Sequence, residues 1–374
     1  MIAIDSVVGR EGRLGQYLYR QLDSLGLACE LHPVEADRYN VYARLQGKRP
    51  GRRLNFYGHL DTVPVCRGWD SDPFVPSQAI GRLYGLGACD MKGGIACILS
   101  MFKAFVDSGY AFDGELSFSG IIDEECCSLG ARAMLETDLA ECDAILLAEP
   151  FSGDEDGPVP LGITGKVLYE LTIAGRAAHG FRPELGINAI EEAARVLTNL
   201  DRLPMREHVD FGRGNCCTLK IEGGYQVYSV VVPDSCRVEI NRLLVPGESA
   251  ASAIRQMEEL VRSLRLGSEI RVRAKPPRYE PFLMNRGERI VKVFHDVYSE
   301  VLGVEPVYTY SRSITDANVF GERSIPCLHL GPAGGNVHEP NEYVSLPWLE
   351  RLPRLYALLA AQFLRNDQTD TGMS

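Results

Sequence analysis

Apolar residues recur at helical spacing near the start of the chain, and short apolar runs alternate with helical patterns further along. Residues 10–25 carry apolar side chains three or four positions apart and stop at Gly26, which predicts an amphipathic helix. Similar patterns predict helices over 94–108 and around Ala131, and strands over 53–57, 115–122, 144–148 and 326–330. This alternation indicates an α/β domain whose sheet carries helices on its faces.

The middle of the chain follows a different order. Its pattern predicts strands over 167–174, 217–222, 227–232, 237–244 and 269–274, and helices over 187–200 and 250–264. Glycine-rich 162–165 and the proline pair 276–277 punctuate the two ends of this region and are candidate hinges. We therefore expect a small α+β domain, residues 163–275, inserted into a larger domain built from residues 1–162 and 276–374.

The composition is typical of a globular protein with two domains. The 374 residues are 45% hydrophobic, which is enough to bury a sizeable core. The net charge of -11 argues against nucleic-acid binding, because phosphate neutralisation needs a surplus of Lys and Arg. No apolar run approaches the roughly 20 residues that span a bilayer, so we expect no membrane insertion. The scattered cysteines and the absence of a secretory pattern at the N-terminus predict reduced thiols and a cytoplasmic protein.

A first group of residues with catalytic potential follows the strand predicted over 53–57. His59 and Asp61 stand two positions apart in the segment 55-NFYGHLDTVPV-65. Residues two apart on extended chain lie on the same side, so the Asp61 carboxylate can accept the second ring N–H of His59. Metal-binding histidines have this arrangement, although a loop histidine beside a capping aspartate has the same pattern.

Other acids and a second histidine stand at strand ends or in glycine-rich loops. Clustered carboxylates raise one another's pKa unless a cation neutralises them, although successive acids can also cap a helix. Histidine and carboxylate ligands suit zinc, cobalt or manganese. Cys89 and Cys126 neighbour two of the acids, but a small buried thiol is the commoner use of cysteine. The candidate groups are Asp90 in 85-GLGACDMKGG-94, the run Asp123, Glu124 and Glu125, then Glu149, and finally His338.

Together and in this order, these motifs resemble those of the acetylornithine deacetylase, succinyl-diaminopimelate desuccinylase and carboxypeptidase G family of co-catalytic zinc hydrolases. The resemblance covers nearly the whole chain and rests on GHLDTVPV, GACDMKGG, DEE, a strand-end Glu and a late His. It implies a zinc-peptidase-like catalytic domain, with a mixed sheet flanked by helices, and an inserted ferredoxin-like domain for dimerisation and closure.

The resemblance also implies roles for single residues. Asp61 would orient His59, and Glu124 would be the general base. His179, in the insert, would reach into the partner's site of a homodimer and stabilise an oxyanion. The implied cofactor is a pair of divalent ions, most simply zinc, with cobalt or manganese as alternatives, and its ligands would be His59, Asp90, Glu125, Glu149 and His338, with Asp90 bridging both ions.

The match is imperfect where relatives bind a substrate carboxylate. Aligned on the following Pro-Gly-Glu, Asn241 is in place, but Leu243 stands where relatives carry an arginine and Arg242 is one position early. On a strand, Arg242 would face the opposite side from that arginine. We keep Asn241 and Arg242 as candidate substrate contacts, together with Thr315 and Asp316, which fit a loop N-cap equally well.

The predicted function is therefore removal of an acyl group from an N-acyl amino acid, or from a related N-acylated amine, by a dimeric metallohydrolase. Carboxypeptidase or dipeptidase activity at the same site is an alternative, and a non-catalytic binding member of the fold is another. Glu124 and the complete ligand set favour an enzyme. A cysteine hydrolase is a further alternative, which metal removal distinguishes because a thiol nucleophile does not need the metal.

Overall fold

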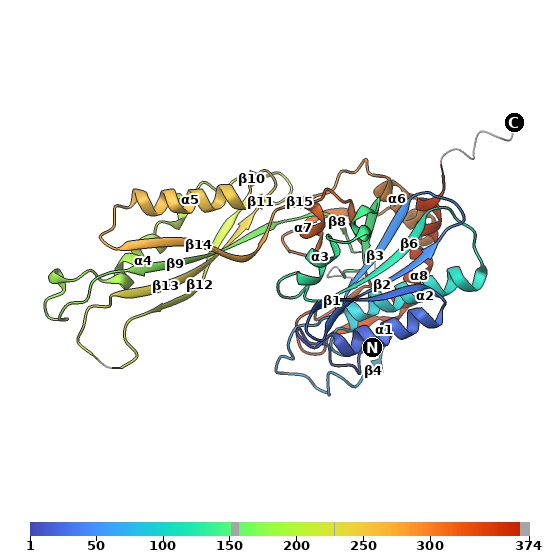
Figure 1. The fold of residues 1–374 in the computed structure, drawn as a ribbon, viewed down its shortest axis with the longest axis horizontal. Helices are drawn as coiled ribbons and strands as arrows, with labels where there is room; N and C mark the ends of the chain where they lie inside the picture. Colours follow the sequence, from blue (N-terminus) through green and yellow to red (C-terminus); the bar gives the residue numbers. More distant parts are fainter. Residues whose placement is uncertain (151–156, 228, 367–374) are drawn as a thin grey trace. The chain divides into compact units, whose positions relative to one another are not determined.

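The computed structural model describes residues 1–150, 157–227 and 229–366 (Figure 1). Contacts divide the chain into two units. Unit 1 contains Met1–Leu161, Met284–Tyr310 and Thr315–Ser374, and unit 2 contains Gly162–Leu283 and Ser311–Ile314. The second junction lies after the expected boundary at 275/276, because strand β14 (Glu269–Tyr279) continues through the proline pair that the sequence marked as a hinge.

A six-stranded mixed sheet forms the centre of unit 1. Its order is β1-β2-β6-β3-β7-β17, with β1, β2 and β6 antiparallel and with β6, β3, β7 and β17 parallel. This arrangement confirms the α/β class that the sequence predicts. The strands are β1 (Ala28–Glu35), β2 (Arg38–Gln46), β3 (Arg53–His59), β6 (Glu115–Ile121), β7 (Ala144–Leu147) and β17 (Cys327–His329).

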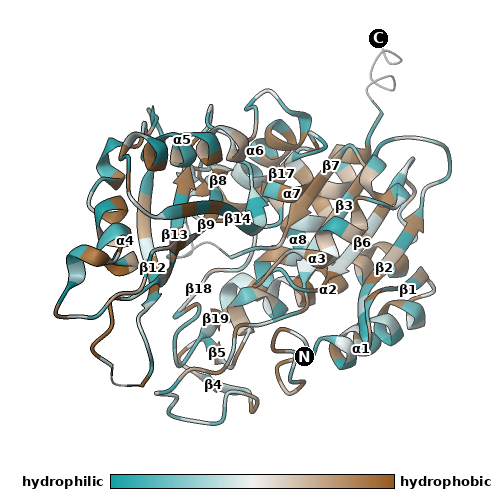
Figure 2. Cartoon of the chain, turned by 60° about the vertical axis from the view of Figure 1, so that its left-hand side comes forward, coloured by the Kyte–Doolittle hydropathy of each residue, from teal (hydrophilic) through white to brown (hydrophobic). Residues whose placement is uncertain are grey.

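Helices cover the central strands of this sheet. Every residue of β6 and β7 is buried, as expected for parallel strands that are covered on both faces, and β7 is coloured hydrophobic in Figure 2. Helices α2 and α8 contact β3, α1 contacts β1 and β2, and α7 contacts β17. The helices are α1 (Gly12–Ser24), α2 (Gly94–Ser108), α3 (Leu129–Met134), α6 (Arg289–Leu302), α7 (Ala317–Gly321) and α8 (Leu346–Leu364).

A small second sheet in unit 1 carries the loop that contains His338. Its order is β18-β19-β5-β4, and β19 contacts the helical turn at Ala88–Gly93. The late histidine is thereby brought beside the segment that contains Asp90. The strands of this sheet are β4 (Ser77–Ala79), β5 (Arg82–Tyr84), β18 (Gly334–Gly335) and β19 (Tyr343–Ser345).

Five further short strands lie outside the sheets named in this section. They are β8 (Val159–Ile163), β10 (Glu207–His208), β11 (Gly212–Arg213), β15 (Phe282–Leu283) and β16 (Tyr308–Ser311).

Unit 2 has the β-α-β-β-α-β order of a ferredoxin-like fold. Its antiparallel sheet has the order β12-β13-β9-β14. Residues alternate between buried and exposed along β9 and β13, and the buried side packs against both helices. The elements are β9 (Gly165–Ala174), α4 (Ala189–Leu197), β12 (Asn215–Gly223), β13 (Ser235–Leu244), α5 (Ala250–Ser263) and β14.

The described residues of one expected strand in this region do not form a strand. Of the predicted strand 227–232, Tyr228 lies outside the described residues, and Val231 makes only an isolated bridge to His179. The side chains of Val227, Val230 and Val231 are exposed, and Val232, at the end of this apolar run, is buried.

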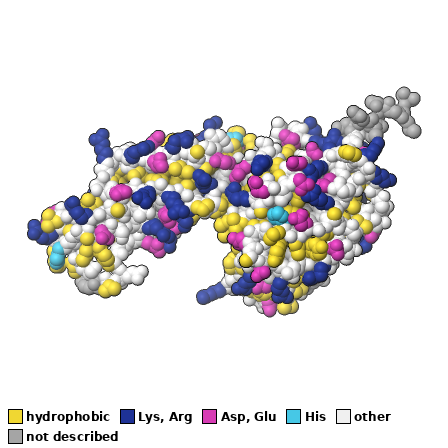
Figure 3. All heavy atoms as spheres, viewed as in Figure 1, with side chains coloured by type: hydrophobic (Ala, Val, Ile, Leu, Met, Phe, Trp, Pro, Cys, Tyr) yellow, Lys and Arg dark blue, Asp and Glu magenta, His cyan; other side chains and the backbone are white. Residues whose placement is uncertain are grey.

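In the view of Figure 3, Lys and Arg side chains are interspersed with Asp and Glu side chains over both units. Among the described residues, no helix combines the length and the apolar character needed to cross a bilayer.

Leu146 offers a test of the unit 1 core. It is fully buried and pairs in register with Phe56 of β3 and Leu328 of β17. We expect Leu146→Ala to lower the free energy of unfolding by about 2 to 5 kcal/mol, because it leaves a cavity in the packed core on one face of the sheet. Denaturant unfolding of the metal-free protein measures this, with Val75→Ala as the control because Val75 is 60% exposed. Equal losses in the two variants would contradict the assigned core.

Candidate metal centre

Three of the parallel strands end at the same edge of the unit 1 sheet and carry acids or a histidine there. His59 is the last residue of β3, Glu124 and Glu125 follow β6, and Glu149 follows β7. Because β6, β3 and β7 are neighbours and run parallel, their carboxyl ends meet at this edge. The topology therefore brings together residues that are far apart in the sequence.

Asp90 lies at the centre of the cluster. Its Oδ1 is 2.9 Å from Nε2 of His59, and its Oδ2 is 3.3 Å from Nε2 of His338. The two oxygens of one carboxylate thus face two different imidazoles, which is the arrangement that a bridging ligand needs.

The remaining acids complete two overlapping groups of donor atoms. Nε2 of His338 is 2.8 Å from Oε1 of Glu125, and Nε2 of His59 is 3.8 Å from Oε2 of Glu149. In each group the donor atoms lie within 4.8 Å of one another, and the groups are His59, Asp90 and Glu149, and Asp90, Glu125 and His338. All five residues predicted as metal ligands are therefore brought together.

One buried oxygen in the cluster has no partner of its own. Oε1 of Glu149 is buried and makes no hydrogen bond with any described residue. An unpaired buried carboxylate oxygen is costly unless it is protonated or binds a cation. Together with two imidazoles and two further carboxylates, this oxygen fits a divalent metal such as zinc, cobalt or manganese.

The pKa shifts of residues in the cluster also favour a bound cation. Burial lowers the pKa of His59, but the charge of Glu149 and the hydrogen bond to Asp90 outweigh it and hold this pKa well above its usual range. Hydrogen bonds to Asp90 and Glu125 raise the pKa of His338 to about 10. Burial and the neighbouring Glu149 raise the pKa of Glu124 well above its usual range. These raised pKa values favour the protonated forms of His59, His338 and Glu124, and a bound cation would compete with those protons.

Asp61 makes different contacts from those expected. Nδ1 of His59 is 2.9 Å from the main-chain oxygen of Asp61, and the Asp61 carboxylate is 3.9 Å away. The carboxylate instead accepts the main-chain N–H groups of Glu124, at 3.2 Å, and Glu125, at 2.9 Å. Asp61 still orients His59, but through its carbonyl, because its side chain holds the turn after β6.

Comparison with known proteins identifies the family. A model of peptidase family M20/M25/M40 matches residues 55–362. The chain belongs to this family. It is 29% identical to the succinyl-diaminopimelate desuccinylase of Erythrobacter litoralis (strain HTCC2594), over 96% of each chain. Membership confirms the predicted family and the predicted class of enzyme, a metal-dependent hydrolase of amide bonds.

Solved structures agree on the fold of this M20 family member. A tripeptidase from Staphylococcus aureus superposes with a TM-score of 0.82 at 22% identity, covering 98% of this chain and 96% of that chain. A dinuclear metal binding peptidase of the M20 family from Bacillus subtilis superposes with a TM-score of 0.73 at 18% identity, covering 96% and 94%. These likenesses confirm the predicted fold.

Glu342 is a site residue that sequence reasoning did not single out. It is buried, and its carboxylate accepts the main-chain N–H groups of Gly87 at 2.8 Å, Cys89 at 2.8 Å and Asp90 at 2.9 Å. In this M20 family member, Glu342 therefore fixes the backbone that carries Asp90. The available signal was an acid four residues after His338 in a polar loop, which is too common a pattern to stand out.

Thr315 and Asp316, predicted to contact substrate, make contacts within unit 1. The hydroxyl of Thr315 accepts the N–H of Ala317 at 3.2 Å and lies 2.9 Å from Nε2 of His329. Asp316 is fully buried and accepts the Tyr57 hydroxyl at 2.7 Å. These contacts resemble the loop-capping alternative, and the substrate-binding role stays a prediction.

Arg242, also predicted to contact substrate, faces the interior of unit 2. It is fully buried, and its guanidinium donates to Glu248 at 2.7 Å and to the Pro204 carbonyl at 3.3 Å. The prediction for Arg242 is wrong, because alternation along β13 turns this side chain toward the helices. Asn241 points to the other face, and its buried Oδ1 has no hydrogen-bond partner among the described residues.

His179 is exposed and has a defined ring orientation. Its ring stacks on Phe181, with 5.4 Å between centroids, and Nδ1 accepts the main-chain N–H of Phe181 at 3.2 Å. A neutral imidazole that accepts at Nδ1 carries its hydrogen on Nε2. The exposed ring therefore presents its Nε2–H as a hydrogen-bond donor on the surface of unit 2.

Glu342 offers a test of the centre that does not require a substrate. We expect Glu342→Ala to weaken zinc affinity by about 10 to 100-fold, since three N–H groups around Asp90 lose their acceptor. Competition with a chromogenic chelator measures the affinity. The matched control is Glu339→Ala, an exposed acid on the same loop, which should bind zinc like the parent. Equal affinities for the two variants would show that Glu342 does not support the centre.

Proposed function

We propose that this M20 family member hydrolyses the amide bond of an N-acyl amino acid, or of a related N-acylated amine. The observation that carries the proposal is the placement of Asp90 between His59 and His338, with Glu124 beside the cluster. The similarity to a succinyl-diaminopimelate desuccinylase along almost the whole chain supports an acylated amino acid as the substrate class.

The proposed ligand assignment follows the two groups of donor atoms. His59 and Glu149 would hold one divalent ion, Glu125 and His338 the other, and Asp90 both. Zinc is the preferred ion, with cobalt or manganese as alternatives. Two such ions supply a water with lowered pKa and a polarised substrate carbonyl.

Glu124 is the proposed general base. Its main-chain N–H donates to Asp61, which holds the turn in place, and its side chain is partly exposed beside the ligand groups. Its carboxylate would take the proton of the attacking water and later give it to the nitrogen of the leaving amine. One carboxylate would therefore act first as base and then as acid.

The proposed oxyanion donor is the Nε2–H of His179. An exposed imidazole with a fixed tautomer suits donation to a negative oxygen. We propose that it acts across a homodimer paired through unit 2. The exposed edge strand β12, with Leu219 59% and Ile221 50% exposed, supports pairing between copies, because such edges are seldom left uncovered.

We also propose a substrate contact and a cellular location. Asn241 is a proposed substrate contact, supported by its unpartnered buried Oδ1. A cytoplasmic location is supported by the eleven cysteines, all of which are free thiols.

A peptidase acting at the same centre is the second candidate. It is favoured by the family and by the likeness of the fold to a tripeptidase. The chemistry at the centre would be the same, since both substrates present an amide carbonyl and release an amine. The two candidates differ only in the groups that flank that amide.

A substrate panel tests the proposal. Zinc-loaded protein is assayed against N-acyl amino acids and dipeptides, and we expect the acylated amino acids to be hydrolysed faster. Preferential cleavage of dipeptides would favour the peptidase, and no turnover of either class would favour a binding protein. Activity that survives a chelator would instead indicate a thiol nucleophile.

The role of Glu124 is tested by Glu124→Gln. We expect kcat to fall by about 10² to 10⁴-fold with zinc content unchanged, because the amide cannot accept a proton. Glu136→Gln, an exposed acid beyond α3, is the matched control and should keep the parental kcat. A Glu124→Gln variant with parental kcat would remove Glu124 as the base.

The action of His179 across the dimer is tested by mixing variants. His179→Ala and Glu124→Gln should each be nearly inactive alone. If each site needs His179 from the partner subunit, dissociated and reassembled mixtures should regain activity, since mixed dimers contain one intact site. Kinetics before and after reassembly measure the gain. Mixtures that stay as inactive as the separate variants would exclude action in trans.

A further inference from the structure

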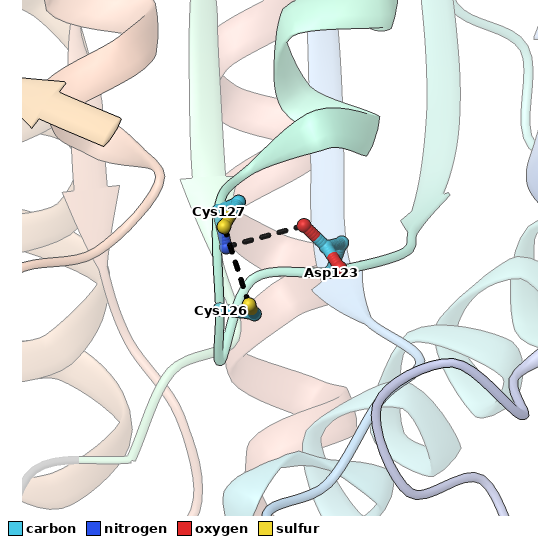
Figure 4. Close-up of side chains that lie close together, drawn as sticks. All are labelled: Asp123, Cys126 and Cys127. Atoms are coloured by element: carbon cyan, nitrogen blue, oxygen red, sulfur yellow. Dashed lines mark hydrogen bonds between the residues drawn. The ribbon is translucent and has the colours of Figure 1, made fainter. Parts of the chain in front are cut away.

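Two adjacent thiols lie on the turn that follows β6. The sulfur atoms of Cys126 and Cys127 are 3.2 Å apart, and Cys126 is exposed while Cys127 is half-buried (Figure 4). Together with the carboxylate of Asp123, they form a group of donor atoms within 4.8 Å of one another. This group is separate from the donor sets that surround Asp90.

The turn holds the two thiols on the same side. Asp123 has a positive φ of 69°, and its main-chain oxygen accepts the N–H groups of Cys127 at 3.1 Å and Ser128 at 2.7 Å. Its side chain accepts the N–H of Cys127 at 3.1 Å and the guanidinium of Arg38 at 2.7 Å. The sulfur pair is therefore preorganised by contacts that do not involve the sulfurs.

A second adjacent pair of cysteines shows that the sequence alone does not create such a site. Cys216 and Cys217 lie in β12, opposite Arg242 and Asn241 of β13. Successive side chains of a strand point to opposite faces, so these two thiols cannot approach a common ligand. The same dipeptide thus forms a convergent pair in the turn and a divergent pair in the strand.

We propose that Cys126 and Cys127 form a binding site for thiophilic trivalent arsenicals. Soft sulfur ligands select such atoms over the harder ions that suit histidine and carboxylate. Both oxygens of Asp123 already accept hydrogen bonds, so the site offers two sulfurs and leaves the third arsenic position to an organic group. A monosubstituted arsenical fits this donor set.

The binding step is an exchange of ligands without oxidation or reduction. An organic arsenical dihydroxide loses both As–O bonds and gains two As–S bonds. The two thiol protons leave with the two hydroxide groups as two molecules of water. Arsenic stays trivalent throughout.

Occupation of the thiol pair would also affect the neighbouring acids. Glu124 and Glu125 precede the pair directly, and their N–H groups bind the Asp61 carboxylate. The organic group on the bound arsenic would crowd these acids and lower hydrolysis. This consequence rests on the proposed function, whereas the binding site does not.

Phenylarsine oxide is the probe for the test. The full-length protein is incubated with one equivalent in the presence of excess glutathione, which competes for single thiols, and is then analysed by intact mass spectrometry. We expect one phenylarsenic group on the parent and on the double variant Cys216→Ser/Cys217→Ser. We expect none on Cys126→Ser or Cys127→Ser, and loss of the adduct after addition of a dithiol. Thermal unfolding verifies that every variant is folded.

Retention of the adduct by Cys126→Ser, or its loss from the Cys216→Ser/Cys217→Ser control, would overturn the site. Hydrolysis is measured separately: the parent should lose activity on binding, and Cys126→Ser should resist. Because the adduct is detected by mass, absence of hydrolysis in every sample would count against the proposed function and leave the site itself standing.

Discussion

The position of the Asp90 carboxylate is the constraint on which the centre depends. Its two oxygens must face His59 and His338 at once, although the surrounding acids repel it. Glu342 holds the backbone on one side of Asp90. On the other side the chain must pass close to β7, because a Cβ on Gly94 would lie 2.5 Å from the oxygen of Ala148. The glycines around Asp90 therefore serve packing as well as backbone freedom.

Charge explains why such a cluster persists in a folded protein. Burial and repulsion from neighbouring acids raise the pKa values of Glu124 and Glu149, which favours their protonated forms in the metal-free site. The acids that oppose folding in the absence of metal include the proposed ligands of the divalent ions. If these side chains bind metal as proposed, folding and metal binding are coupled through them.

The sequence predicted most of the acids and histidines that meet at the carboxyl edge of the unit 1 sheet. Parallel strands bring their carboxyl ends together whatever their separation in the chain. Helix α2 and strand β13 lie close to their predicted ranges, since their periodicity is regular. Contacts that depend on backbone atoms could not be predicted. Asp61 uses its carbonyl for His59, and Glu342 binds N–H groups, so neither partnership leaves a pattern in side-chain types. The half-exposed strand β1 and helix α8, which contains Pro353, also lack a clear periodic signal.

The turn after β6 is tied to the start of the chain through Arg38. Its guanidinium donates to Asp123 at 2.7 Å and to the two oxygens of Glu11 at 2.6 and 2.9 Å, and Glu11, at the beginning of α1, is fully buried. The acids at the centre are thereby anchored to a segment more than a hundred positions earlier in the chain. Removal or unfolding of the N-terminal helix would deprive the Arg38 guanidinium of its buried partner Glu11 and loosen the catalytic turn, so the enzyme cannot shed this helix as an independent appendage.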